Sequence, residues 1–137
     1  MKPGFRILPH TSEMGLELKA PDWASFYRCA AEGLLAVYGA RLEGRGRARL
    51  SWSFRGGSPE DVLVAWLNEL VFLVGTKRFR LSGLEVLQAA PDGLRVRILG
   101  ERRRRLPLER EIKAATYHGL KVRALRSGLT ARLILDV

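Results

Sequence analysis

The sequence predicts an α+β fold formed by one domain that spans residues 1–137. Two long stretches place apolar residues at helical spacing, and several shorter stretches alternate apolar and polar residues as half-buried strands do. The two helices do not alternate regularly with the strands, as they would in the βαβ units of a parallel sheet. At 137 residues the chain is long enough to bury a core without metal or disulfide support.

The first helix is expected to begin after Asp22, a favourable N-cap residue, and to end near Gly39. Its inward stripe consists of Phe26, Ala30, Leu34 and Val37. Cys29 lies in the same helix. Because no activating base is adjacent, we expect Cys29 to be a small buried apolar residue rather than a nucleophile.

The second helix has clear initiation signals, with Ser58 as N-cap and Pro59 at the first helical position. It is expected to run to about Val74 and to be covered on more than one side, since most of its circumference is apolar. Its polar residues, Asn68 and Glu69, are expected to form a solvated strip. A role in a binding site is the alternative.

Strands account for most of the remaining chain. The apolar alternation predicts them at residues 5–8, 14–19, 45–55, 80–89, 94–99, 120–125 and 129–135. Pro91-Asp92-Gly93 has the composition of a hairpin turn, and a last hairpin is expected around Ser127-Gly128. Residues 109–117 are harder to classify, and a short helical turn leading into a strand is one interpretation of them.

Positive charge is the main feature of the composition. The 24 Lys and Arg residues exceed the 14 Asp and Glu residues, giving a net charge of +10. Such an excess favours polyanions or acidic protein surfaces as partners. Arg47 and Arg49 belong to the basic face of a predicted strand, and the densest run consists of Arg102, Arg103, Arg104 and Arg105. This run is expected to be either a solvated loop or a patch that faces a partner.

The predicted location is the cytoplasm. The amino terminus has no apolar signal core, and the longest apolar run, around residues 62–74, is too short to cross a bilayer. A single cysteine excludes an internal disulfide and fits a reducing compartment.

Two sets of residues are candidates for chemistry. His10 and His118 are the only histidines, and both sit in polar clusters. They are compatible with acid–base work, whereas the spacings typical of zinc sites are absent. Glu13 lies at a strand junction, and Asp136 is followed by the carboxylate of Val137. If their strands are neighbours, these oxygens converge into a site for a hard cation such as Mg²⁺ or Ca²⁺. The alternative is that both acids are merely solvated.

Several segments resemble motifs of the archease family. Residues 10–15, His-Thr-Ser-Glu-Met-Gly, are similar to its His-Thr-Ala-Asp-Val/Ile-Gly signature, and residues 66–70 match its Trp-Leu-Asn-Glu-Leu helix. Residues 111–118, Glu-Ile-Lys-Ala-Ala-Thr-Tyr-His, resemble its Glu-Ile-Lys-Ala-Val-Thr-Tyr-His segment. Gly100-Glu101 and the closing Asp136-Val137 also match. These motifs occur in the family's order across nearly the whole chain.

The resemblance implies a mixed fold, with helices between antiparallel or mixed β-layers. It also implies an accessory protein, not itself the ligase, of the RtcB-type RNA ligase in tRNA splicing and RNA repair. Such a protein promotes guanylylation of the ligase and multiple turnover. By position, Glu13 and Asp136 would form the family's divalent metal site, with Val137 beside them. His10, Lys113 and His118 would line or orient this surface. Glu13 departs from the pattern, because the family usually has Asp there.

Two other functions compete with this one. A basic RNA-binding chaperone, or a partner of an RNA-modification enzyme, would use Arg47, Arg49 and the run from Arg102 to Arg105. A small metal-dependent hydrolase would use His10 and His118.

Overall fold

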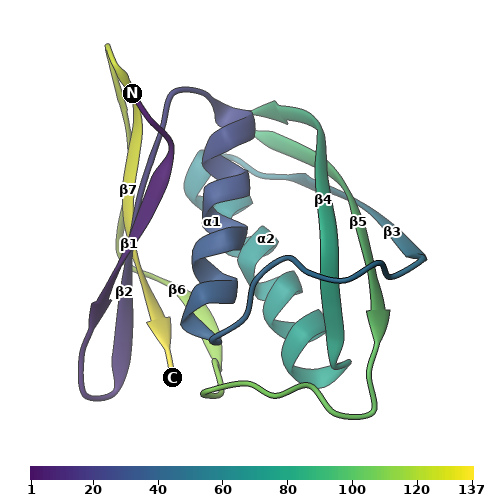
Figure 1. Ribbon diagram of the computed structural model, residues 1–137. Helices are drawn as coiled ribbons and strands as arrows, with labels where there is room; N and C mark the ends of the chain where they lie inside the picture. Colours follow the sequence, from purple (N-terminus) through teal and green to yellow (C-terminus); the bar gives the residue numbers. More distant parts are fainter.

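The computed structural model describes all residues from Met1 to Val137. Two antiparallel sheets enclose the helices α1 and α2 between them (Figure 1). The elements follow in the order β1 (Gly4–Pro9), β2 (Glu13–Ala20), α1 (Trp23–Val37), β3 (Ala48–Arg55), α2 (Pro59–Val71), η1 (Phe72–Thr76), β4 (Phe79–Ala90), β5 (Gly93–Arg102), β6 (Ala114–Leu125) and β7 (Gly128–Asp136). The predicted α+β class and the β-layers around two helices are confirmed.

The first sheet joins the two ends of the chain. Its strand order is β1-β2-β7-β6, and every neighbouring pair is antiparallel. Along β2 the residues alternate as predicted: Leu16 and Leu18 are buried against the helices, whereas Lys19 is exposed on the other face. The pairing of β2 with β7 therefore brings residues near the start of the chain against residues near its end.

The second sheet has the order β3-β5-β4. The predicted hairpin of β4 and β5 is present, although both strands extend beyond the expected ranges. On β3, Leu50, Trp52 and Phe54 pack against the core, and the alternating residues are exposed. The strand begins at Ala48 rather than at residue 45, so Arg47 precedes it.

Helix α1 begins and ends where the sequence indicates. Asp22 is the N-cap, and its carboxylate accepts a hydrogen bond of 2.8 Å from the Ser25 amide. Gly39 follows the helix with a φ of 78°, a left-handed conformation that glycine adopts without strain. The predicted inward stripe, including Phe26 and Leu34, is fully buried.

Helix α2 begins as predicted at Ser58, whose hydroxyl accepts a hydrogen bond from the Asp61 amide at 3.2 Å. The α-helical part ends at Val71, and the expected continuation to Val74 is a π-helical turn. Trp66 is fully buried near the centre of the molecule and donates its indole N–H to the Tyr27 carbonyl at 2.9 Å. This bond ties α2 to α1 across the core.

The prediction of a helical turn within residues 109–117 is wrong. Residues 109–113 form neither helix nor strand, with a bend at Glu109 and Arg110, and β6 begins at Ala114. The segment gains its order from long-range contacts: the Glu109 amide donates to the Tyr38 carbonyl, and the buried Ile112 side chain packs in the core. Local propensity therefore yields to tertiary packing at this point.

One cluster of 32 buried side chains includes residues from both helices and both sheets. Neither helix combines the length and the apolar character that a membrane-crossing helix needs.

Candidate functional site

Glu13 and Asp136 lie directly opposite each other on the neighbouring strands β2 and β7. The next pair along the ladder, Met14 and Leu135, is buried in the core. Because side chains alternate along a strand, Glu13 and Asp136 both point to the outward face of the sheet. Directly opposed residues have Cβ atoms about 5 Å apart. The pairing of β2 with β7 thus places Glu13 and Asp136 on the same face, at one end of the sheet.

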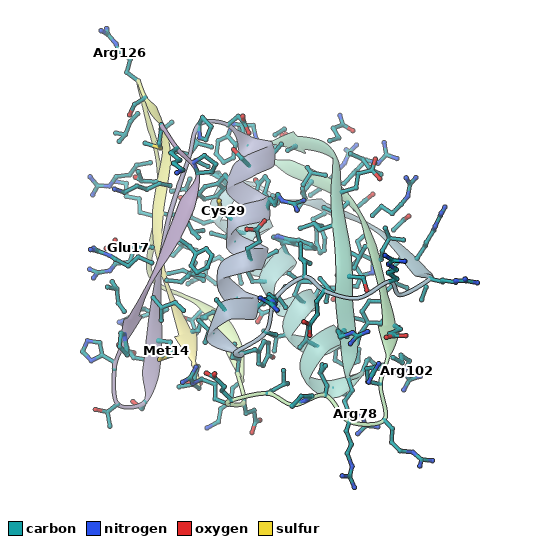
Figure 2. The ribbon with its side chains drawn as sticks, viewed as in Figure 1. Met14, Glu17, Cys29, Arg78, Arg102 and Arg126 are labelled. Atoms are coloured by element: carbon teal, nitrogen blue, oxygen red, sulfur yellow. The ribbon has the colours of Figure 1, made fainter.

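The outward face of this sheet is visible in Figure 2, where Glu17 on β2 points away from the helices. Glu17 lies on this face, two residues after Gly15. Its carboxylate forms ion pairs with Arg132 on β7, at 3.8 Å, and with Arg6 on β1, at 2.7 Å. Glu13 has no such ion pair. Its half-buried carboxylate and the exposed one of Asp136 are consequently available to a cation from outside the protein.

Lys113 and Val137 flank Asp136 in different ways. The Lys113 amide donates a hydrogen bond of 2.7 Å to the Asp136 carbonyl, so the main chains of these two residues lie side by side, and the Lys113 side chain is exposed. The Val137 side chain is half-buried and packs against the core, so only the main-chain oxygens of this residue could coordinate a cation.

His10 and His118 lie on one shallow pocket of about 400 Å³. The pocket is lined by Leu8, His10, Glu13, Gly15, His118, Gly119, Arg132 and Ile134. His118 reaches it through an irregularity in β6 between Thr116 and Lys121, where Gly119 has a φ of 65°. The structure thus joins the two histidines to Glu13, while Asp136 and Lys113 lie outside this pocket's lining.

No three His, Cys, Asp or Glu side chains of the chain form a cluster that could hold a metal ion by themselves. The donor set at the sheet end is therefore Glu13 and Asp136, two carboxylates side by side. Mg²⁺ is commonly held by one or two carboxylates together with substrate phosphates, whereas Ca²⁺ takes roughly six to eight oxygens. Two carboxylates could supply part of a divalent cation's coordination, and the remaining ligands would have to come from water or from another molecule.

Asn68 is neither a solvated residue nor part of this pocket. Its side-chain amide donates to the Ala115 carbonyl at 3.1 Å and accepts from the Ala115 amide at 2.8 Å. It thereby attaches α2 to β6 one residue after Ala114, which pairs with Asp136. The prediction of a solvated strip is wrong for Asn68, although Glu69 is exposed as expected. An amide within an otherwise apolar helix was the available signal, since a buried amide requires partners.

The basic residues are distributed over separate surfaces. Arg102 is the last residue of β5, and Arg103, Arg104 and Arg105 are exposed on the connection to β6. Figure 1 shows this connection at the same end of the molecule as the β1–β2 turn and the carboxyl terminus. Arg49, in contrast, lies on the outward face of the other sheet.

The thiol of Cys29 is not part of any site. Burial raises its pKa, as does the nearby negative charge of Glu32, so the thiol stays protonated at neutral pH. This agrees with the prediction of a buried apolar residue.

Comparisons with known proteins place these motifs in one family pattern. Residues 5–137 match the model of the Archease protein family (MTH1598/TM1083). A protein named archease from Archaeoglobus fulgidus is 27% identical over 138 residues, which cover 97% of this chain and 98% of that protein. A second, from Methanosarcina barkeri, is 31% identical over 140 residues, with 97% and 95% covered.

Two solved structures share the fold. The solution structure of protein 1598 from Methanobacterium thermoautotrophicum has a TM-score of 0.67 at 22% identity and covers 98% of this chain and 99% of its own. The crystal structure of an archease from Thermotoga maritima, described as a possible chaperone, has a TM-score of 0.67 at 20% identity, with 95% and 94% covered.

Proposed function

Because this chain belongs to the archease family, we propose that it is the accessory protein of an RtcB-type RNA ligase and promotes guanylylation and multiple turnover of that ligase. The observation that carries the proposal is the opposition of Glu13 and Asp136 at an exposed end of the first sheet. Two adjacent carboxylates with no basic partner in the protein suit a divalent cation that is shared with another molecule.

The ligase reaction explains why such a cation would be useful. A bound Mg²⁺ neutralises phosphate charge during nucleotidyl transfer and orients the phosphate oxygens. In this chain Glu13 and Asp136 would hold the ion at the surface, where the nucleotide phosphates of a docked ligase can complete its coordination. The Lys113 backbone fixes the position of the Asp136 main chain, and Asn68 holds the adjacent strand.

His10 and His118 are proposed to contact the ligase or its nucleotide. Both are exposed and lie beside Glu13 on the same pocket, so a partner that approaches the carboxylates also meets the imidazoles. The exposed arginines of the β5–β6 connection, at the same end of the molecule, would add attraction to ligase-bound RNA (Figure 1).

The test is a guanylylation assay of a matching RtcB-type ligase with Glu13→Gln and Asp136→Asn. These variants keep side-chain size and remove one negative charge each. Both are expected to lose most of the stimulation, and raising the Mg²⁺ concentration is expected to restore part of it. Glu17→Gln, on the same strand and face, is the control and should stimulate fully. Full stimulation by both carboxylate variants would remove the metal-presentation mechanism.

Glu13 also allows a test of geometry. Its side chain is one methylene longer than the Asp that is usual in the family, which moves the carboxylate by about 1.5 Å. Glu13→Asp is therefore expected to retain stimulation, unlike Glu13→Gln. Equal loss in both variants would show that the ligase requires the length of the side chain as well as its charge.

A second candidate function rests on the outward face of the β3-β5-β4 sheet. Arg49 and Arg55 on β3 and Arg95 and Arg97 on β5 share this face, with Ser51 and Ser53 between them. Only Arg97 of this group has an ion pair, with Glu85 at 3.2 Å. This face favours an RNA-binding chaperone, which predicts strongly salt-dependent RNA binding without a ligase. An absence of binding at low salt would exclude it.

A further inference from the structure

A second pocket, of about 240 Å³, lies between the end of α1, the start of β4 and the β5–β6 connection. Its lining includes four arginines, Arg41, Arg80, Arg103 and Arg105, and one acid, Glu43. It shares no residue with the pocket that contains His10, Glu13 and His118. It is therefore a separate pocket, and a ligand could bind there without the Glu13–Asp136 pair and without a ligase.

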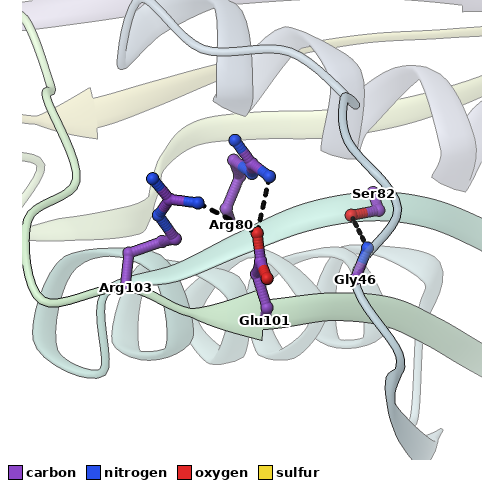
Figure 3. Close-up of polar contacts among 5 residues, drawn as sticks. All are labelled: Gly46, Arg80, Ser82, Glu101 and Arg103. Carbon is purple, nitrogen blue, oxygen red and sulfur yellow. Dashed lines mark hydrogen bonds and ion pairs between the residues drawn. The ribbon is translucent and has the colours of Figure 1, made fainter.

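Ion pairs hold two of these guanidinium groups in place. Arg80 donates to Oε1 of Glu101 at 2.5 Å, and Arg103 donates to the same oxygen at 3.1 Å (Figure 3). A shared carboxylate fixes both cations without neutralising both. Arg80 and Arg103 come from β4 and from the connection after β5, so the tertiary fold brings them together.

Arg80 is the most confined of the four. Its side chain is 26% exposed, and its Nε atom is buried without a hydrogen-bond acceptor in the protein. Gly44 packs so closely against the guanidinium that a β-carbon at that position would collide with it. A partly desolvated cation with an unmet donor is costly, and an anion nearby would reduce that cost.

The charge balance of the pocket remains positive. Glu43 lies 3.6 Å from Arg41, and Glu101 is shared by Arg80 and Arg103, while Arg105 makes no ion pair or hydrogen bond in the structure. Four guanidinium groups thus face two carboxylates, which leaves an excess of two positive charges. A phosphate monoester carries about −1.5 to −2 at pH 7. The excess matches a phosphate monoester better than a single carboxylate.

Size and surroundings restrict the ligand further. The lining also includes apolar residues, Phe79, Leu81 and Leu106 among them, and low-dielectric neighbours strengthen the attraction between the guanidinium groups and an anion. Pockets for whole drug-sized ligands typically have about 300–1,000 Å³, so this one suits a phosphate group with a small part of its carrier. Guanidinium groups match phosphate oxygens in geometry as well as in charge.

We propose that this pocket binds a phosphate monoester group through Arg41, Arg80, Arg103 and Arg105. Inorganic phosphate, a nucleoside 5′-monophosphate and the 5′-phosphorylated end of an RNA strand all present this chemistry. The pocket adds to the proposed function a site for a phosphate that does not depend on a metal ion.

The experiment uses the intact protein and NMR titration of its backbone amides at constant ionic strength. The probes are inorganic phosphate, GMP, and a short RNA with either a 5′-phosphate or a 5′-hydroxyl. The expected result is saturable binding with shifts concentrated in residues 39–43 and 103–107. Tighter binding of inorganic phosphate, of GMP or of the 5′-phosphorylated RNA identifies the source of the group, and each of these outcomes supports the pocket.

Neighbouring arginines supply the matched variants. Arg105→Gln and Arg103→Gln are each expected to weaken binding by about tenfold, the effect of removing one charge-assisted hydrogen bond. Arg104→Gln removes the same charge from the same run outside the pocket lining, and should bind nearly as the unmodified protein does. Arg105 is exposed and makes no internal contact by hydrogen bonding, so its variant should unfold at an unchanged temperature.

Three results would overturn the proposal. The first is an absence of saturation by phosphate or GMP across the millimolar range. The second is equal weakening by Arg104→Gln and Arg105→Gln, which would indicate diffuse electrostatic attraction. The third is a set of shifts that maps to the outward faces of the sheets rather than to the pocket.

Discussion

Asn68 holds Ala115 through both atoms of its side-chain amide, with Nδ2 3.1 Å from the Ala115 carbonyl oxygen and Oδ1 2.8 Å from the Ala115 nitrogen. The amide thus occupies the place that a neighbouring strand would take beside β6, at the edge of the first sheet. Ala115 itself is buried. The side chain of Asn68 therefore supplies the hydrogen-bond partners of the Ala115 backbone, which is buried away from water.

Asn68→Ala should lower the free energy of unfolding by about 2–3 kcal/mol, because the variant leaves a buried N–H and a buried C=O without partners. Urea denaturation followed by circular dichroism measures this. Asn68→Asp keeps the hydrogen-bond acceptor but loses the donor, so its free energy of unfolding should lie between those of the unmodified protein and Asn68→Ala. The adjacent exposed residue supplies the control, since Glu69→Ala should change the free energy by less than about 0.5 kcal/mol. Equal small effects at both positions would contradict the structural role of Asn68.

Asp22 makes the stability of α1 dependent on pH. Hydrogen bonds from the amide and the hydroxyl of Ser25 lower the pKa of the Asp22 carboxyl. A lowered pKa in the folded state stabilises the protein above the unfolded value of about 3.9, and this contribution is lost as the pH falls through the folded-state pKa. Since the carboxylate is almost fully exposed, solvent screening keeps the electrostatic part small.

Asp22→Ala is accordingly expected to cost about 1 kcal/mol at pH 7, the usual effect of removing an N-cap. The difference between the unmodified protein and Asp22→Ala should narrow below a pH of about 3.9. Asp22→Asn also caps the helix but does not titrate, so its difference from Asp22→Ala should stay constant. Parallel curves for all three proteins between pH 7 and acid would refute the assignment. Thermal unfolding at a series of pH values gives the comparison.

Gly100 is required where β5 pairs with β4, opposite Leu81. A β-carbon at this position would overlap the Arg80 carbonyl oxygen and the Phe79 ring, both of which belong to β4. Gly100→Ala should therefore lower the free energy of unfolding by about 1–3 kcal/mol, or more if the strands must separate. Gly4→Ala is the control, because nothing lies within 4 Å of its added carbon. Calorimetry that found equal melting temperatures for both variants would show that the strands adjust freely.

Cys29 should be inert in the folded protein. The side chain is buried, and burial raises the pKa of the thiol above its usual value of about 8.5. Only the thiolate reacts, so an aromatic disulfide reagent at pH 7.5 should label Cys29 slowly in buffer and rapidly in urea. Because the pKa of the thiol is higher in the folded than in the unfolded protein, the free energy of unfolding should fall as the pH rises above about 8.5. Fast labelling of the native protein would indicate an accessible, activated thiol instead.

Much of the fold could be predicted from local features. Asp22 and Ser58 cap the helices where expected, and Arg49 lies on the exposed face of β3, as its alternation with apolar residues indicates. These features depend on a few consecutive residues and on a simple period of 2 or about 3.6. The same approach failed at residues 109–113, whose conformation depends on contacts with Tyr38 and the core.

Only part of the candidate site could be predicted from the sequence. The residue types at Glu13 and Asp136 suggested a cation, but their meeting depended on an assumption about which strands are neighbours. Asn68 was assigned to a solvated strip, because nothing near it in the sequence reveals Ala115 as its partner. The convergence of Arg41, Arg80, Arg103 and Arg105 is likewise invisible in the sequence, apart from the run that contains the last two.

By itself, the sequence determined the two helices and where each begins, most of the strands, and the motifs of the family. Each of these depends on local chemistry or on residues that can be compared position by position. Only the tertiary structure decided that Glu13 opposes Asp136 rather than a neighbouring residue. The physical reason is register: backbone hydrogen bonds between distant strands set it, and a slip of one residue would turn a carboxylate from the outward face into the core.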